Sequence, residues 1–355
     1  MSRPLLLVTG QVPPDRVGAL QELHAREGLQ VALFDGRLHH ATAGVADPGV
    51  PVVRISSRQA FSLAASGRYR AVIASSAGRV ALPAAFFGAR RSRTPFVYWT
   101  GIWHQVATPA HLAGAPLVRW IESRSDAVVA YGPHVADHVR AHGARNVHVA
   151  PQAVDVAFWS EPVDGTALRA RLGSPSFLLA FAGRDRPGKG LRTAIGAWNQ
   201  SGVEGAFALA GVEAGRRWER EPGVHPLGVL DATSMRELYA AADAVVIPSE
   251  PTRAFREPWA LVANEAMLQG TAVIATDSVG AAAGGLIRDG QTGLVVPAGD
   301  AAVLARAIGR LAEDRQLREG LAGRGRSEAG AFDFAAWSTA VSRALESAGA
   351  GQRPC

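Results

Sequence analysis

Short aliphatic runs and amphipathic stretches alternate along this chain, and that alternation limits its fold more than any other feature. In the first half, the runs predicted to be strands are residues 5–10, 31–36, 71–76, 95–101, 127–132 and 147–152. Residues 19–28 and 134–143 lie between them as amphipathic helices that end at glycine, the residue that suits a helix C-cap. Alternation of strands and helices predicts a parallel sheet with helices on both faces.

The alternation pauses over residues 152–175, which contain turn signals, and then resumes. The second set of predicted strands comprises residues 177–183, 206–211, 224–228, 244–249, 272–277 and 293–299. A chain of 355 residues is long for one core and natural for two domains. We therefore predict the α/β class with two Rossmann-like domains. Their boundaries are 1–155 for the first domain, 156–175 for a linker, 176–332 for the second domain and 333–355 for a last helix and tail.

Cysteine use and hydropathy indicate where such a chain works. Its one cysteine is Cys355, so neither an intrachain disulfide nor a cysteine-based metal site is expected. The opening residues 1–10 predict a first buried strand rather than a signal peptide. No apolar run approaches the roughly 20 residues of a membrane span. We expect a cytoplasmic protein.

Charge is unevenly distributed around the net value of +6. Residues 1–155 hold 16 Arg and 9 acidic residues, whereas residues 156–355 hold 21 basic and 22 acidic residues. The basic half has two interpretations of equal weight. It is attracted to an anionic acceptor or to the anionic inner face of a membrane, or it is a solvated face without a partner. Residues 82–93 place two Phe beside three Arg, which suits an anionic membrane contact, although an apolar helix face with a basic end is the favoured interpretation. No nucleic-acid partner is expected.

Residues 244–280 carry the strongest chemical signal. A strand ends at Ser249, and a helix is predicted to begin near Pro258, because proline suits a first helical turn. The N–H groups at that helix start, together with the helix dipole, would bind a diphosphate. Those N–H groups belong to Trp259, Ala260 and Leu261.

Two acidic residues flank this predicted helix start. Glu257 lies at its mouth and can accept hydrogen bonds from sugar hydroxyls. Glu265 lies one turn beyond Leu261 and can accept both hydroxyls of a ribose, because a carboxylate accepts two donors side by side. The competing interpretation is an ordinary helix with two exposed acids.

This segment resembles the signature of the GT4 family of retaining glycosyltransferases, which have the GT-B fold. The family pattern is Glu, seven residues, Glu, with Gly-Leu-Val inside it, and here it is Glu257-Pro-Trp-Ala-Leu-Val-Ala-Asn-Glu265. Ala260 stands where the family usually has Gly. The resemblance implies two domains facing a central cleft, with the nucleotide-sugar donor on the second domain and the acceptor on the first. It also implies that the last helix, residues 333–349, can cross back to the first domain.

The loop FAGRDRPGKG at residues 181–190 resembles the family's Gly-Arg-x-x-x-x-Lys-Gly loop. The resemblance implies that Arg184 and Lys189 clamp the diphosphate of the leaving nucleotide. Two fixed cations stabilise that diphosphate more as its negative charge develops. Lys189 is the chain's only lysine. The competing interpretation is a solvated basic turn.

Further candidates carry weaker signals. Residues 224–249 resemble the family's stretch through the base pocket, which places the backbone near Val229 and Leu230 beside a base edge, although simple core and loop is the favoured interpretation of these two residues. His104, after the strand at 95–101, is the candidate for contact with the transferred sugar or the reacting centre, with His111 as a rival. A histidine packed against Trp103, or a surface histidine on the acceptor side, is an equal alternative. Gly10 can let the acceptor or sugar approach the backbone, or simply form a turn.

The expected function is retaining transfer of a sugar from a nucleotide-diphosphate-sugar to a hydroxyl of a glycan, glycolipid or small metabolite. The implied mechanism is front-face attack in which the leaving phosphate helps to deprotonate the acceptor. No resident cofactor and no metal are expected, because Arg184 and Lys189 supply the positive charge and the chain has no Asp-x-Asp. The alternatives are a nucleotide-sugar epimerase of the same fold and a nucleotide-sugar-binding protein without turnover.

Overall fold

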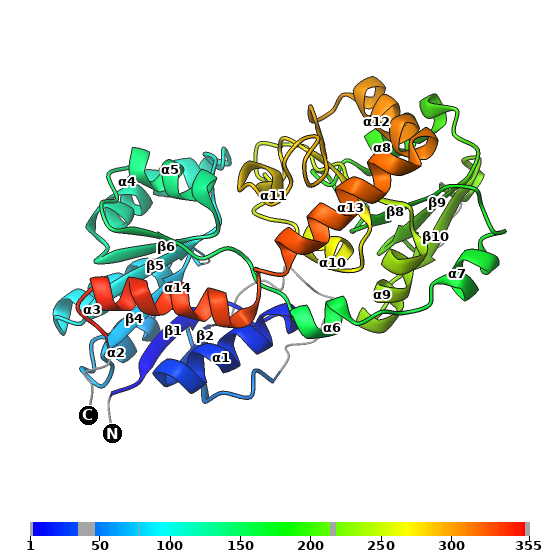
Figure 1. Cartoon of the computed structure of the whole chain (residues 1–355). Coiled ribbons are helices and arrows are strands. Elements are labelled where there is room, and N and C mark those ends of the chain that lie inside the picture. Colours follow the sequence, from blue (N-terminus) through cyan, green and yellow to red (C-terminus); the bar gives the residue numbers. More distant parts are fainter. Residues whose placement is uncertain (1–2, 35–46, 77, 214–217, 352–355) are drawn as a thin grey trace. The chain divides into compact units, whose positions relative to one another are not determined.

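The computed structural model describes residues 3–34, 47–76, 78–213 and 218–351, and the chain divides into two compact units (Figure 1). The first unit is Met1–Val154 together with Asp333–Cys355, and the second is Asp155–Phe332. Cys355 lies outside the described residues. Each unit contains a parallel sheet with helices on both faces, so the predicted fold class is confirmed.

The sheet of the first unit has the strand order β3-β2-β1-β4-β5-β6-β7 across the described residues, and every neighbouring pair is parallel. Its strands are β1 (Leu5–Thr9), β2 (Leu29–Phe34), β3 (Val52–Ile55), β4 (Ala71–Ser75), β5 (Phe96–Thr100), β6 (Ala127–Ala130) and β7 (Val147–Val149). The strand predicted at 31–36 begins two residues earlier, and its last two residues lie outside the described ranges.

Alternate residues of β1 feed two cores. Leu5 and Leu7 point into a core that also contains residues of α1 (Val17–Glu27) and α14 (Phe334–Ser347). The short helix η1 (Pro14–Arg16) precedes α1. Leu6 and Val8 point into the other. That second face is covered by α2 (Gln59–Ala64), α3 (Ala81–Arg91), α4 (Pro109–Arg124) and α5 (Pro133–Ala141). Helix α14 packs along α1, so the last helix returns to the first unit as expected (Figure 1).

The second unit repeats the architecture with the strand order β10-β9-β8-β11-β12-β13 across its described residues. Its strands are β8 (Leu178–Ala182), β9 (Ala206–Ala210), β10 (Val224–Gly228), β11 (Ala244–Ile247), β12 (Ala272–Thr276) and β13 (Leu294–Val296). Its helices are α6 (Val156–Ser160), α7 (Thr166–Arg171), α8 (Leu191–Ser201), η2 (Trp218–Arg220), α9 (Ala232–Ala241), α10 (Val262–Leu268), α11 (Gly280–Ala283), α12 (Ala301–Glu313) and α13 (Arg315–Ala329). The segment predicted as a linker contains α6 and α7 and groups with this unit.

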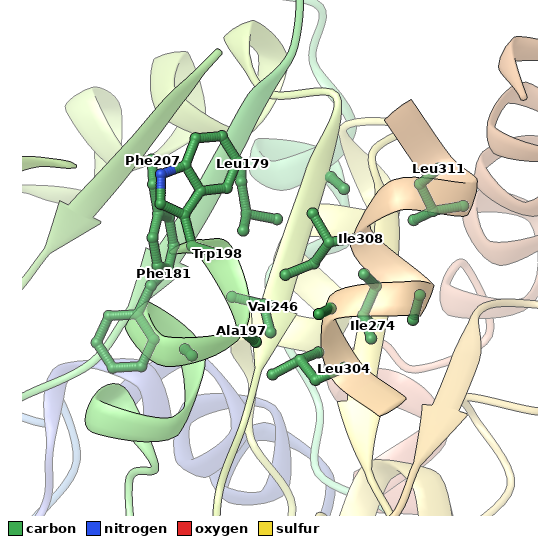
Figure 2. Close-up of a cluster of buried hydrophobic side chains, with 14 of the residues drawn as sticks. Leu179, Phe181, Ala197, Trp198, Phe207, Val246, Ile274, Leu304, Ile308 and Leu311 are labelled. Atoms are coloured by element: carbon green, nitrogen blue, oxygen red, sulfur yellow. The ribbon is translucent and has the colours of Figure 1, made fainter. Parts of the chain in front are cut away.

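One large apolar core fixes the central strands of this second sheet. Figure 2 shows strand side chains such as Phe181, Phe207 and Ile274 packed against Trp198 of α8 and Ile308 of α12. All of them are nearly inaccessible to water, and burial of each stabilises the fold by roughly 1.5–3 kcal/mol. The strand ends are therefore a rigid base for the loops that follow them.

The described residues include no helix that combines the length and hydrophobicity needed to span a bilayer.

Candidate active site

Lys189 and Glu257 meet at the carboxyl ends of two neighbouring strands. Lys189 lies on the loop after β8, Glu257 lies on the segment after β11, and these strands pair in parallel. The Lys189 ammonium donates to Glu257 Oε2 in an ion pair. Ser249 Oγ donates to the same oxygen at 2.9 Å. Glu257 is only 6% exposed, so two donors compensate the loss of water around its carboxylate.

The lysine loop is fixed by close backbone contacts with the end of β11. Gly190 has φ +66°, and a Cβ there would lie 1.7 Å from the carbonyl oxygen of Pro248, so only glycine fits. Glu250 N donates to Gly188 O at 2.9 Å, and Thr193 Oγ1 donates to the Glu250 carboxylate. The loop is therefore held on both sides of Lys189, at Gly188 and at Gly190.

Phe255 lies over this loop. The Lys189 ammonium and the Arg186 guanidinium are each 5.5 Å from its ring centroid, within range of a cation–π attraction. A Cβ on Gly188 would approach the ring to 2.5 Å. Sequence reasoning assigned no role to Phe255 or to Ser249, and neither differs by residue type from ordinary loop and core positions.

The predicted start of the helix is wrong. Helix α10 begins at Val262, four residues after Pro258, and it has only seven residues. Gly280 N donates to Glu257 O at 3.0 Å and Ala281 N donates to Trp259 O at 2.8 Å. These bonds hold residues 257–259 as an extended segment against α11, and therefore the helix cannot begin there. Trp259 and Ala260 therefore precede the helix in irregular backbone, and Leu261 is its N-cap residue.

Ala260 adopts φ +75°, a conformation in which the side chain of an L-residue is strained. The strain explains why a glycine suits this position.

We expect Ala260→Gly to raise the free energy of unfolding by about 0.5–1 kcal/mol, which is the relieved strain less the extra entropy of a glycine in the unfolded chain. Thermal unfolding measures the change. Ala254→Gly, at an exposed loop position, is the control, and a lower midpoint for Ala260→Gly would contradict the argument.

Glu265 of α10 is oriented by a buried tyrosine. Tyr239 OH donates to Glu265 Oε2 at 2.8 Å. Burial raises the pKa of Tyr239, and the neighbouring Glu265 carboxylate raises it further, so the phenol stays a donor. Thr271 Oγ1 donates to Tyr239 O at 2.7 Å. This role was not visible in the sequence, because Tyr239 occupies an ordinary core position of α9.

The remaining predicted donor-side residues have diverse surroundings. Trp259 is buried, and its Nε1 donates to Asn264 Oδ1 at 2.8 Å. Arg184 is half-buried on the loop after β8, where its carbonyl accepts from Arg186 N at 2.9 Å. Leu230 is half-buried between β10 and α9, and β10 lies two strands from β8. The structure thus brings Lys189 and Glu257 into direct contact. Trp259, two residues after Glu257, is anchored by its hydrogen bond to Asn264.

On the first unit, His104 follows β5 and Gly10 follows β1. A Cβ on Gly10 would lie 3.2 Å from the Phe34 ring. The Trp103 ring packs edge-on against His134, with centroids 4.7 Å apart.

Arg16 is a cation near the carboxyl ends of this first sheet that sequence reasoning missed. Its guanidinium lies 4.7 Å from the Trp99 ring centroid and 5.1 Å from that of Tyr131, and it donates to Tyr131 OH at 2.7 Å. Asp15 lies 3.9 Å from it. A guanidinium has five donors, so this one can also bind an anion.

Three histidines spaced four residues apart, His134, His138 and His142, lie on and just beyond α5, and the last of them contacts Glu122 of α4. The rings of His138 and His142 are 4.5 Å apart, and His142 Nδ1 lies 2.7 Å from Glu122 Oε2. Burial raises the pKa of Glu122, and the hydrogen bond from His142 opposes that shift. The spacing was visible in the sequence, but nothing there distinguished it from surface histidines.

Acid is expected to destabilise the first unit through His138. Burial, with the charges of His142, His104 and Arg119, lowers the His138 pKa from 6.5 to about 4. The unfolded chain therefore binds more protons between these two values, and stability present above pH 6.5 is lost as the pH falls toward 4. When the pH falls from neutral to about 4.5, near the folded-state pKa of His138 of about 4, we expect the free energy of unfolding to fall less for His138→Gln than for wild type. Denaturant unfolding at both pH values tests this, with the exposed His111→Gln as control; equal losses in wild type and His138→Gln would contradict it.

Within the described part of the chain, no group of three or more His, Cys, Asp or Glu is placed to hold a metal ion. The positive charge beside Glu257 is that of Lys189, and Arg184 and Arg186 lie on the same loop. This end of the second sheet can therefore bind an anionic group through fixed cations.

Comparison with known proteins agrees with this architecture. Residues 176–314 match the family described as glycosyl transferases group 1. A D-inositol 3-phosphate glycosyltransferase of Geodermatophilus obscurus is 34% identical over 231 residues, which cover 56% of this chain and 47% of that protein. The corresponding protein of Actinosynnema mirum is 32% identical over 223 residues, covering 53% of this chain and 48% of that protein. The chain thus spans about half the length of the curated relatives it matches.

Solved structures match the fold over the whole chain. HepE of Anabaena, in complex with UDP, superposes with a TM-score of 0.81 at 21% identity, covering 98% of this chain and 100% of that one. Sucrose-phosphate synthase of Thermosynechococcus elongatus superposes with a TM-score of 0.75 at 20% identity, covering 97% of this chain and 98% of that one. The chain therefore has the GT-B fold, and its second unit is similar to the glycosyl transferases of group 1.

Proposed function

We propose that this protein transfers a sugar from a nucleotide-diphosphate-sugar to an acceptor hydroxyl, with retention at the anomeric carbon. The observation that carries the proposal is the Lys189–Glu257 pair at the ends of β8 and β11, inside a domain that matches glycosyl transferases group 1. A buried acid bonded to a fixed cation provides adjacent partners for sugar hydroxyls and for a diphosphate.

In the proposed reaction, the bond between the anomeric carbon and the donor phosphate oxygen breaks, and its electron pair goes to the phosphate. The acceptor oxygen forms its bond to the same carbon on the same face, and its proton passes to the leaving phosphate. Lys189 and Arg184 stabilise the negative charge that develops on the diphosphate. We expect no resident cofactor, and we expect these two cations to supply the charge that a metal ion supplies elsewhere.

On the donor side, Glu265 would accept the ribose hydroxyls while Tyr239 holds one of its oxygens. The backbone near Leu230 would meet the base. Glu257 would contact the transferred sugar, and the segment Pro258, Trp259, Ala260 and Leu261 would lie beside the phosphates. Uridine is the first base to test, because HepE structures are known in complex with UDP and with UDP-glucose.

On the acceptor side, we assign the first unit, with Gly10 and His104 beside the reacting centre. Arg16 and the basic composition of residues 1–155 favour an anionic acceptor. D-inositol 3-phosphate is the first small acceptor to test, because the curated relatives bear its name. Glycan and glycolipid acceptors form the rest of the panel.

The test is release of nucleoside diphosphate from a panel of nucleotide sugars, with and without each acceptor, together with the anomeric configuration of the product. Release that needs an acceptor and gives a retained product supports the proposal. Conversion of the sugar without an acceptor would identify an epimerase, and tight binding without turnover would identify a sensor. Inversion at the anomeric carbon would overturn the proposed mechanism alone, and the same assay with a chelator checks the expected independence of metal.

A further inference from the structure

Exposed apolar side chains gather on one face of the first unit. Phe61 of α2, Phe87 of α3, and Leu112, Leu117 and Trp120 of α4 are each between 39% and 50% exposed. In the second unit, Val229 is the only large hydrophobic side chain among the described residues that is exposed to this degree. We call these five residues the α2–α4 face. Apolar residues scattered singly are normal on a protein surface, but a cluster on adjacent helices marks a binding surface.

The aromatic residues of the α2–α4 face are in contact with one another. The Phe87 and Trp120 rings are stacked with centroids 5.8 Å apart, and both rest on the buried Phe86 at 5.4 and 5.3 Å. Helices α2 and α3 also approach closely, because a Cβ on Gly88 would lie 2.4 Å from the carbonyl oxygen of Phe61. The stacked pair is therefore a fixed apolar platform on rigid helices.

Helix α4 presents its apolar side outward. Leu112, Pro116 and Trp120 recur every four residues on one exposed side, whereas its buried residues are Ile121 and Glu122. A helix that serves only as scaffold buries its apolar stripe against the core. In α4 the apolar stripe faces outward instead, and it is therefore available to an external apolar phase.

Charge around this face is mainly positive. Residues 48–121 include nine arginines and no aspartate or glutamate. The ends of α3 and α4 carry the exposed Arg91, Arg119 and Arg124. Of the two acids that follow this stretch most closely, Glu122 is buried and bonded to His142, and Asp126 forms an ion pair of 3.2 Å with Arg90. A protein partner would need acidic residues of its own opposite Arg91, Arg119 and Arg124, whereas an anionic bilayer supplies negative headgroups continuously beside an apolar interior.

We propose that the α2–α4 face seats this protein on the surface of an anionic lipid bilayer. Phe87, Leu112 and Trp120 enter the boundary between headgroups and acyl chains, and the surrounding arginines bind phosphate groups while their aliphatic stems remain against apolar surface. The contact is peripheral and uses side chains of folded helices. It does not depend on the proposed transferase activity, because it involves none of the residues assigned to donor binding.

Vesicle flotation of the purified full-length chain tests the proposal. We expect the protein to float with vesicles of equal parts phosphatidylcholine and phosphatidylglycerol, to float poorly with pure phosphatidylcholine, and to be released by high salt, which screens the arginines. Trp120→Glu is expected to lower the partition coefficient on the anionic vesicles at least about tenfold. Val229→Glu makes the same change at an exposed apolar residue of the second unit and should bind like wild type.

Thermal midpoints equal to that of wild type show that the variants are folded, and Leu117→Glu on the same face replaces Trp120→Glu if the latter unfolds. Absence of wild-type flotation with anionic vesicles, equal flotation with neutral ones, or undiminished flotation of the folded variant would overturn the proposal. Nucleotide sugar is absent from the assay, so a failed membrane proposal and a failed transferase proposal give separate results.

Discussion

Lys189→Met is expected to lower kcat for sugar transfer about 10²- to 10³-fold. The ammonium is fixed by its bond to Glu257, by the glycine conformation at Gly190 and by the ring of Phe255, so it is aligned before charge develops on the leaving diphosphate. A cation that interacts more strongly with the transition state than with the bound donor affects kcat more than KM. Steady-state kinetics with saturating acceptor measures both constants.

Arg186→Met is the matched control for charge. Arg186 lies three residues before Lys189, its guanidinium is at the same 5.5 Å distance from the Phe255 centroid, and it is exposed. Its loss removes one positive charge from the same loop, and we expect less than about a threefold change in kcat because exposed charges are screened. Equal effects of the two variants would mean that Lys189 contributes only general positive potential.

Stability separates the role of Lys189 in catalysis from its role in folding. Lys189→Met leaves the Glu257 carboxylate buried with Ser249 as a remaining donor, which is expected to cost about 1–3 kcal/mol. Adding Glu257→Gln removes the uncompensated charge and keeps an acceptor for Ser249. The double variant should therefore recover stability without recovering activity, and recovery of both would show that the single variant failed only because it was poorly folded.

The central strands could be predicted because they are buried on both faces. Strands such as β1 and β8 are continuous aliphatic runs, which is the pattern of parallel sheets covered by helices. Strand β3 was missed because it lies at the edge of its sheet, where two of its four residues are exposed and Arg54 interrupts the apolar run. Edge strands bury less surface and therefore leave a weaker pattern in the sequence.

The site was predictable where local sequence determines the geometry. The loop that carries Lys189 depends on neighbouring glycines, and its position after a strand was visible. The start of α10 was not, because it depends on hydrogen bonds that Gly280 and Ala281 donate to Glu257 and Trp259, which lie more than 20 residues before them in the chain. The bond from Tyr239 to Glu265 likewise joins residues 26 positions apart, and its donor matches the pattern of any core residue.

Glu265→Gln is expected to raise KM for the nucleotide sugar about 10- to 100-fold while changing kcat much less. A carboxylate can accept both ribose hydroxyls, whereas an amide has one acceptor oxygen and presents donors in place of the other. The ribose is remote from the bond that breaks, so this contact stabilises the bound donor and the transition state alike. Lys189→Met should show the reverse pattern, with its main effect on kcat.

Tyr239→Phe tests whether the orientation of Glu265 contributes to that binding. The variant keeps the carboxylate but removes the hydrogen bond of 2.8 Å, so we expect a rise in KM smaller than that of Glu265→Gln, with kcat again little changed. If Glu265 served only to satisfy the buried Tyr239 hydroxyl, glutamine would still accept that bond through its carbonyl oxygen and KM would stay at the wild-type value. Donor titrations at fixed acceptor, with binding of the free nucleoside diphosphate measured by calorimetry on the same variants, decide between a ribose contact and a purely structural pair.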